Sequence, residues 1–244
     1  GVRQIDELGL DRPILENLRR FERADGGMLV ITGPAGSGKT TTIYALLADL
    51  AAHNQGLSIV SLEDPVERVL PGVTQIEVKP FGQLTYERAL RSILRQDPQV
   101  LMLGEIRDVA TAQLAVAAAM SGHRLISTLH GGSAAGAIAR MLEMGLEPYQ
   151  ITSALWGVLA QRLVRKTSEQ REYRGRTAVG ELLLMDMDLR RVVLDRPDLQ
   201  RLGDTAAMQP GFVPMRDAAT QLINHGVTDQ NEWDRIFGAS LIPS

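Results

Sequence analysis

The sequence contains no cysteine, only four histidines and 4% aromatic residues. The absence of cysteine excludes disulfide bonds and thiolate metal sites. No spacing of aspartate, glutamate and histidine matches a stand-alone metal site. The few aromatic side chains leave little means of stacking on nucleic-acid bases, and a net charge of −3 gives no overall attraction to a phosphate backbone. Nucleic acid is therefore not an expected partner.

Long apolar runs are also missing. No run approaches the roughly 20 apolar residues of a membrane-spanning helix, and the N-terminus lacks the pattern of a signal peptide. We therefore expect a cytoplasmic protein. The 244 residues suffice for one large α/β domain with a small appendage. The chain opens on Gly1 rather than methionine, which predicts a processed protein or a piece of a longer one.

The most informative stretch matches the phosphate-binding pattern G-x-x-x-x-G-K-[ST] in full. Its residues are Gly33, Pro34, Ala35, Gly36, Ser37, Gly38, Lys39 and Thr40. Glycines let successive backbone N–H groups turn inward around phosphate oxygens. Lys39 can reach the β- and γ-phosphates, and the Thr40 hydroxyl can ligate Mg²⁺. An apolar run at 28–32 predicts a strand before this loop, and helical spacing at 40–52 predicts a helix after it. The sequence thus predicts binding of a nucleoside triphosphate.

Three further predicted strands lead directly into residues that could act on the phosphates. These are residues 57–62 before Glu63, residues 100–103 before Gly104 and Glu105, and residues 125–129 before His130. In a parallel α/β sheet, ligands bind at the carboxyl ends of the strands. We expect the bound triphosphate to be hydrolysed by a water molecule that attacks the γ-phosphate. Glu63 is expected to position or deprotonate this water, with Glu105 as the alternative base. Glu105 is also placed to hold the Mg²⁺ shell through water, and His130 to donate to a γ-phosphate or sense its loss.

A helix predicted over 85–95 carries Arg91 and Arg95. Such arginines often belong to a solvated face. The alternative is anion recognition, in which a guanidinium stabilises phosphate charge across a subunit boundary. We retain both arginines as candidates for that role.

The rest of the chain divides into three predicted parts. They are a lead-in linker and helix over 1–25, an ATPase core over 26–166, and a polar loop, strand and helical subdomain over 167–244. Helical spacing predicts helices at 111–120, 134–144 and 151–163, the last ending near Arg162, Arg165 and Lys166. An exposed strand or hairpin arm is expected at 73–78, a mobile polar loop at 167–176 and a strand at 177–184. Short helices are expected at 190–194, 215–223 and 232–237.

Taken together, these motifs resemble the secretion ATPase superfamily that powers type II secretion and type IV pilus assembly, the GspE/PilB group. The landmarks are the phosphate loop at 33–40, an aspartate box at 63–67, a Walker B element at 103–108 and a histidine box at 122–130. The segments 90–98 and 159–164 are also similar to family signatures. The resemblance covers nearly the whole chain.

The resemblance implies an α/β fold of the RecA-like P-loop class, with a mostly parallel central sheet flanked by helices and a small C-terminal helical subdomain. It implies a homo-hexamer that binds ATP and Mg²⁺ near subunit boundaries. The implied partners are a membrane-platform protein and a preceding domain of the same chain. The implied location is the cytoplasmic side of a bacterial membrane, with peripheral attachment.

The chain departs from the family pattern at two places. Family members often carry a tetracysteine zinc loop after the segment that corresponds to 161–166, but residues 167–175 contain no cysteine, so zinc is not predicted. The histidine box usually continues with Thr-Asn-Asp, whereas here Gly131, Gly132 and Ser133 follow His130. The hydrogen-bonding surroundings of His130 are therefore expected to differ.

Two other functions are compatible with a RecA-like fold. A nucleic-acid translocase or packaging ATPase would be stimulated by DNA or RNA and would bind it with steep salt dependence. A nucleotide-gated binding module would change conformation with negligible turnover. The carboxylates Glu63 and Glu105 together with His130 favour hydrolysis over such a module.

Overall fold

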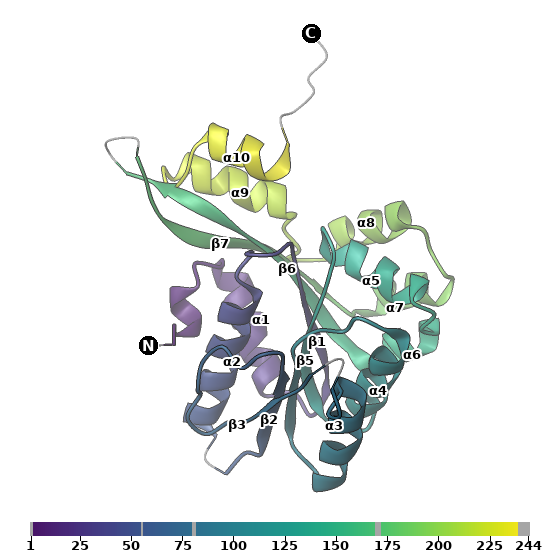
Figure 1. The fold of residues 1–244 in the computed structure, drawn as a ribbon. Coiled ribbons are helices and arrows are strands. Elements are labelled where there is room, and N and C mark those ends of the chain that lie inside the picture. Colours follow the sequence, from purple (N-terminus) through teal and green to yellow (C-terminus); the bar gives the residue numbers. More distant parts are fainter. Residues whose placement is uncertain (1, 55, 80–81, 169–171, 239–244) are drawn as a thin grey trace.

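The computed structural model describes residues 2–54, 56–79, 82–168 and 172–238. Within these residues, seven strands form one sheet in the order β3-β2-β4-β5-β1-β6-β7 (Figure 1). The strands are β1 (Gly27–Thr32), β2 (Ile59–Glu63), β3 (Thr74–Glu77), β4 (Val100–Leu103), β5 (Arg124–Leu129), β6 (Leu155–Thr167) and β7 (Tyr173–Leu184). Strands β1 to β6 run parallel, and β7 pairs antiparallel with β6.

Helices cover both faces of this sheet. They are α1 (Arg12–Glu22), α2 (Lys39–His53), α3 (Tyr86–Ile93), α4 (Val109–Met120), α5 (Ala134–Glu143), α6 (Pro148–Ala154), α7 (Met187–Leu194), α8 (Leu199–Met208), α9 (Met215–Asn224) and α10 (Gln230–Phe237). Figure 1 shows α1 and α2 on one side of the sheet and α3 to α8 on the other. The α9–α10 pair lies on the long ribbon that β6 and β7 form beyond the other strands.

The central strand β1 explains why the sequence forms this three-layer arrangement. Met28, Leu29, Val30 and Ile31 are all fully buried, as expected for a parallel strand covered on both faces. Because side chains alternate along a strand, Met28 and Val30 join the core beneath α4, whereas their neighbours join the core beneath α1 and α2. This rigid centre delivers the phosphate loop at its carboxyl end.

Most predicted elements are confirmed, with ends that differ by a few residues. The strands expected at 28–32, 57–62, 100–103, 125–129 and 177–184 correspond to β1, β2, β4, β5 and β7. The segment expected at 73–78 contains β3, which is an edge strand parallel to β2 rather than a hairpin arm. Asp11 caps α1 as expected, because its Oδ1 accepts from the Ile14 backbone N–H at 3.0 Å.

The helix predicted over 151–163 is wrong. Helix α6 ends at Ala154, and the chain continues as β6. Leu155, Val158 and Leu159 fit helical spacing, but a short, nearly continuous apolar run fits a doubly covered strand equally well. Strand β6 lies between β1 and β7, so both of its edges find hydrogen-bond partners. Tertiary pairing therefore decided an assignment that periodicity left ambiguous.

The second half of the chain contains two further differences. Thr167 ends β6 and Tyr173 begins β7, so part of the loop expected at 167–176 is strand, and residues 169–171 lie outside the described residues. Helix α8 was not predicted. The predicted domain boundary after residue 166 falls inside β6, which pairs with β7 in the same sheet. The division into 1–25, 26–166 and 167–244 stays a prediction.

Across the described part of the chain, no helix has the length and apolar character needed to cross a membrane.

Candidate active site

Four parallel strands deliver the predicted residues to one edge of the sheet. A cavity of about 340 Å³ at this edge is lined by Lys39, Thr40, Glu63, Glu105 and His130. We call it the carboxylate cavity. Its wall also includes residues to which no role was assigned from the sequence, among them Asp64, Glu67, Tyr86 and Arg107. Glu63, Glu105 and His130 end or follow β2, β4 and β5, whereas Lys39 and Thr40 begin α2 after the loop that follows β1, so the parallel topology explains their convergence.

The phosphate loop has a conformation that requires glycine. Gly33 has φ +152°, and a Cβ there would collide with the Gln161 carbonyl oxygen and the Ser37 hydroxyl. Gly38 caps α2 in the left-handed region at φ +89°. The loop is thus built for close backbone approach, as a phosphate cradle needs.

Lys39 extends back over the loop that carries it. Its Nζ donates to the carbonyl oxygens of Gly33 and Pro34 at 2.8 and 3.0 Å. Burial lowers the pKa of Lys39, and the negative charge of Glu105 opposes that shift. The ammonium group is therefore held beside the loop by two carbonyl oxygens, and Glu105 of the same cavity favours its charged form.

Gln161 of β6 holds the phosphate loop through its side-chain amide. Its side chain is buried, its Nε2 donates to the Ser37 carbonyl oxygen at 2.8 Å, and its Oε1 accepts from the Thr42 hydroxyl at 2.9 Å. One amide thus ties the loop and the first turn of α2 to the neighbouring strand. The signal for this role was a polar residue directly after the apolar run 155–160, which the helix prediction obscured.

Glu63 is the last residue of β2 and is only 3% exposed. Its Oε1 accepts from the Ser61 hydroxyl at 2.6 Å and from Gln75 Nε2 at 3.0 Å, and its Oε2 accepts from the Tyr44 hydroxyl. A carboxylate offers about four acceptor positions. Three are used, so one position on Oε2 is left for a further donor. Burial and the hydrogen bond to Glu63 raise the pKa of Tyr44 to about 12, which keeps its hydroxyl protonated.

Glu105 and His130 meet at the mouth of the cavity. His130 Nε2 lies 2.6 Å from Glu105 Oε1, and Arg107 Nε donates to Glu105 Oε2. The turn after β4 is tied to β5, because the Thr128 hydroxyl donates to the Gly104 carbonyl oxygen at 2.7 Å. The Glu105 side chain is 16% exposed and that of His130 is 74% exposed. His130 can therefore contact both Glu105 and a molecule entering the cavity.

The oxygen atoms around Thr40 are suitable ligands for a magnesium ion. The Thr40 hydroxyl lies 3.5 Å from Glu67 Oε1, and Glu105 lines the same cavity. Mg²⁺ prefers hydroxyl, carboxylate and phosphate oxygens and usually keeps several waters, so one or two protein ligands suffice. In the described ranges, no group of three or more histidine, cysteine, aspartate or glutamate side chains could hold a metal ion by itself. The absence of zinc stays a prediction from the sequence.

Arg91 and Arg95 do not reach the carboxylate cavity of their own chain. Arg91 of α3 pairs with Glu87 at 3.0 Å, and Arg95 lies 3.4 Å from the Ser92 hydroxyl. Neither lines the cavity. Their action across a subunit boundary stays a prediction.

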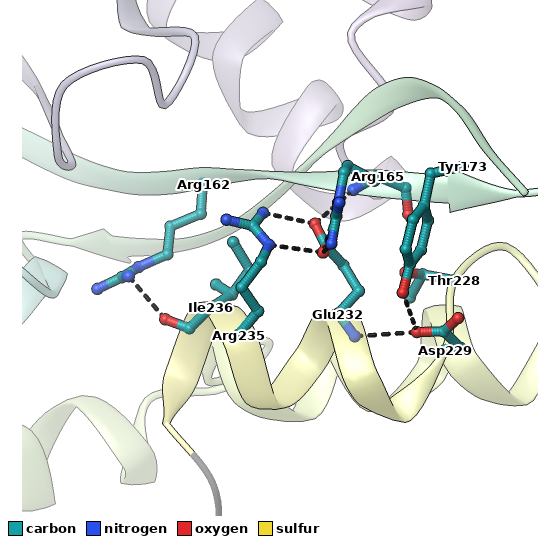
Figure 2. A network of polar contacts seen from close by, with 8 residues as sticks. All are labelled: Arg162, Arg165, Tyr173, Thr228, Asp229, Glu232, Arg235 and Ile236. Carbon is teal, nitrogen blue, oxygen red and sulfur yellow. Dashed lines mark hydrogen bonds and ion pairs between the residues drawn. The ribbon is translucent and has the colours of Figure 1, made fainter.

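A second cavity, of about 510 Å³, lies on the other side of the phosphate loop. It is lined by loop residues 34–37 and by Arg162, Leu163, Arg165, Arg176, Arg235 and Ile236. We call it the arginine cavity. Figure 2 shows Arg162 and Arg165 on β6 and Arg235 on α10. The sequence had placed Arg162 and Arg165 at the end of a helix, so the cavity depends on the strand that replaced it.

Comparisons with known proteins identify the family to which the chain is similar. The family model for the type II/IV secretion system protein matches residues 2–235. Type II secretion system protein HxcR of Pseudomonas aeruginosa is 40% identical, over 97% of this chain and 54% of its own length. Type II secretion system ATPase E of Vibrio cholerae is 37% identical, over 95% of this chain and 52% of its own length. The crystal structure of the pilus retraction motor PilT with bound ADP is similar with a TM-score of 0.81 and 28% identity, covering 97% of this chain and 67% of that one.

The similarity to PilT, together with the mostly parallel sheet, confirms the predicted RecA-like fold class. The chain spans about half the length of these curated relatives. Because the family model and both relatives match almost all of the chain, it belongs to the type II/IV secretion system protein family.

Proposed function

We propose that this chain is the ATP-hydrolysing motor domain of a type II secretion or type IV pilus assembly ATPase. The observation that carries the proposal is the carboxylate cavity, where Lys39 and Thr40 of a phosphate loop face Glu63, Glu105 and His130. One relative is named a type II secretion system ATPase, and the solved PilT structure contains ADP. A nucleotide therefore suits both the residues and the relatives.

The two cavities support a proposed orientation of ATP. Ala35 lines both, so the loop separates the carboxylate cavity from the arginine cavity. Lys39 and the catalytic candidates lie on the carboxylate side, which supports our placing the reactive end of the triphosphate there. The base and ribose then belong to the arginine cavity. Thr40 and Glu105 would hold Mg²⁺, which neutralises charge on the phosphate oxygens.

Glu63 is the residue that we assign to the attacking water. Its three hydrogen bonds fix the carboxylate, and the remaining acceptor position on Oε2 can bind one water proton. A rigid acceptor orients the water for in-line attack and receives its proton as the bond to phosphorus forms. Glu105 remains the alternative base.

His130 couples the γ-phosphate side of the cavity to Glu105. Its Nε2 is shared with Glu105 Oε1, and its exposed ring can donate to a phosphate oxygen instead. Loss of the γ-phosphate would return that nitrogen to Glu105. This exchange is a simple physical basis for sensing hydrolysis.

We further propose that the working unit is a homo-hexamer that acts on a membrane-platform protein together with a preceding domain of the same protein. Arg91 and Arg95 would then stabilise phosphate charge from a neighbouring subunit. Membership of the secretion family supports this assembly. The expected location is the cytoplasmic side of a bacterial membrane, with peripheral attachment.

The test uses the full-length protein, with MgATP binding measured by calorimetry and turnover by phosphate release. Lys39→Ala is expected to abolish binding, because it removes the only lysine of the loop. Glu63→Gln is expected to bind MgATP normally and to slow turnover by about 100-fold or more. Normal turnover in Glu63→Gln would remove Glu63 from this role, and normal binding in Lys39→Ala would overturn the proposed function. Added DNA or RNA is expected to leave the rate unchanged.

A further inference from the structure

We infer that Glu232 is a positioning residue of the nucleotide site, which holds Arg165 and Arg235 in the wall of the arginine cavity and so makes α10 part of that site. The inference rests on the proposed function, because it requires the base and ribose of the nucleotide to occupy this cavity. The residues involved come from two places far apart in the sequence, β6 and α10 (Figure 2).

Glu232 has no exposed side-chain surface and is saturated with donors. Its Oε1 accepts from the Arg165 backbone N–H at 2.8 Å and from Arg235 Nη2 at 2.6 Å. Its Oε2 accepts from Arg165 Nε at 2.8 Å and from Arg235 Nε at 2.7 Å. Because these bonds fill all four acceptor positions, Glu232 cannot bind a ligand itself. Any influence on a ligand must pass through the two arginines.

The side chains of the two arginines are held by Glu232 but remain partly exposed to solvent. The side chains of Arg165 and Arg235 are 39% and 50% exposed, and both line the arginine cavity. The Arg165 guanidinium also lies 3.9 Å from the centre of the Tyr173 ring, which restricts the orientation of its plane. A planar cation held in one orientation can stack on a flat aromatic ring or pair with an anion. A nucleotide base with its ribose and α-phosphate offers both chemistries.

Helix α10 is anchored to the ribbon at both of its ends as well as at Glu232. Near its start, Asp229 accepts from the Tyr173 hydroxyl at 2.8 Å. At its end, Arg162 Nη1 donates to the Ile236 carbonyl oxygen at 2.9 Å. The helix therefore has a defined position relative to β6, as Figure 2 shows.

Strand β6 connects Glu232 and its two arginine partners to the phosphate loop. Gln161, which bonds to Ser37 of the loop, precedes Arg165 by four residues on the same strand. Arg162 and Leu163 between them also line the arginine cavity. The loop, the cavity wall and α10 thus all contact the same strand, so a displaced α10 would also displace the arginines of the cavity wall.

The experiment compares two ligands of the full-length protein. MgATP contains a base and a ribose, whereas inorganic tripolyphosphate offers only the phosphates. In Glu232→Gln we expect the KM for MgATP to rise about tenfold, the size expected for losing a charge-assisted hydrogen bond, with little change in kcat. The inhibition constant of tripolyphosphate is expected to stay unchanged. A general loss of structure would weaken both ligands together.

Two further variants keep the test decisive. Arg235→Lys keeps a positive charge beside Glu232 but lacks the planar group, and we expect the same selective loss of MgATP affinity even if Glu232→Gln fails to fold. Glu172→Gln is the matched control, because Glu172 forms an exposed ion pair with Arg174 at 3.1 Å on the same ribbon. Unchanged MgATP affinity in Arg235→Lys and Glu232→Gln, or equal weakening of both ligands, would overturn the inference. Lys39→Ala tests the proposed function separately, so the two failures are distinguishable.

Discussion

His130 Nε2 lies 2.6 Å from Glu105 Oε1, although the two residues follow different strands of the sheet. The contact exists because β4 and β5 are adjacent, parallel and in register from Val100 opposite Arg124 to Leu103 opposite Ser127. The bond from the Thr128 hydroxyl to the Gly104 carbonyl then draws the two strand ends together. This pairing links the predicted Mg²⁺ ligand to the predicted phosphate sensor.

Replacing His130 should therefore affect turnover more than binding. In His130→Ala we expect kcat to fall about 100-fold, since Glu105 loses a partner and the γ-phosphate loses a donor. MgATP affinity should stay within about twofold, because the loop and Lys39 are untouched. Phosphate release and calorimetry measure the two quantities. His53→Ala is the control, because His53 lies exposed at the end of α2, and unchanged kcat in His130→Ala would contradict the assigned role.

Tyr44 should act on the reaction through Glu63. Tyr44→Phe removes the hydroxyl that donates to Glu63 and accepts from the Glu67 backbone N–H at 3.1 Å. We expect kcat to fall about tenfold because the carboxylate is less well oriented, with the KM for MgATP nearly unchanged. Tyr149→Phe, at a 57% exposed position on α6, provides the control. A rise in KM with normal kcat would show that Tyr44 serves binding instead.

The free energy of unfolding should depend on pH through the titration of Glu232. Burial alone would raise the pKa of Glu232, but hydrogen bonds from Arg235 and Arg165 outweigh it and lower that pKa from 4.5 to about 2. A carboxyl with a depressed folded-state pKa stabilises the protein above its unfolded pKa, and this contribution is lost as the pH falls toward the folded value. We therefore expect the loss to occur between about pH 5 and pH 2.

Urea unfolding at a series of pH values measures this effect. Glu232→Gln should be less stable than the parent at pH 7, and the difference should shrink as the pH approaches 2. The exposed-pair variant Glu172→Gln should follow the parent at every pH. A stability difference that is independent of pH would show that the charge of Glu232 is not what holds α10.

The sequence-based predictions succeeded where the signal was local. The loop at 33–40 and the strand-end residues Glu63, Glu105 and His130 were identified from short patterns, and the structure places them around one cavity. They failed at 151–163, where an apolar run satisfied helical and strand spacing alike. That error also hid the arginine cavity, because Arg162 and Arg165 were assigned to a helix end rather than to the strand beside the loop.

By itself, the sequence determined a phosphate loop between a strand and a helix, because glycine, lysine and threonine at fixed spacing have a local geometric meaning. It also determined that three later strands end in residues suited to phosphate chemistry. Only the tertiary structure decided that His130 reaches Glu105, that Gln161 supports the loop, and that Glu232 clamps Arg165. These contacts depend on strand order and register, and such pairings between distant segments leave no periodic trace in the chain.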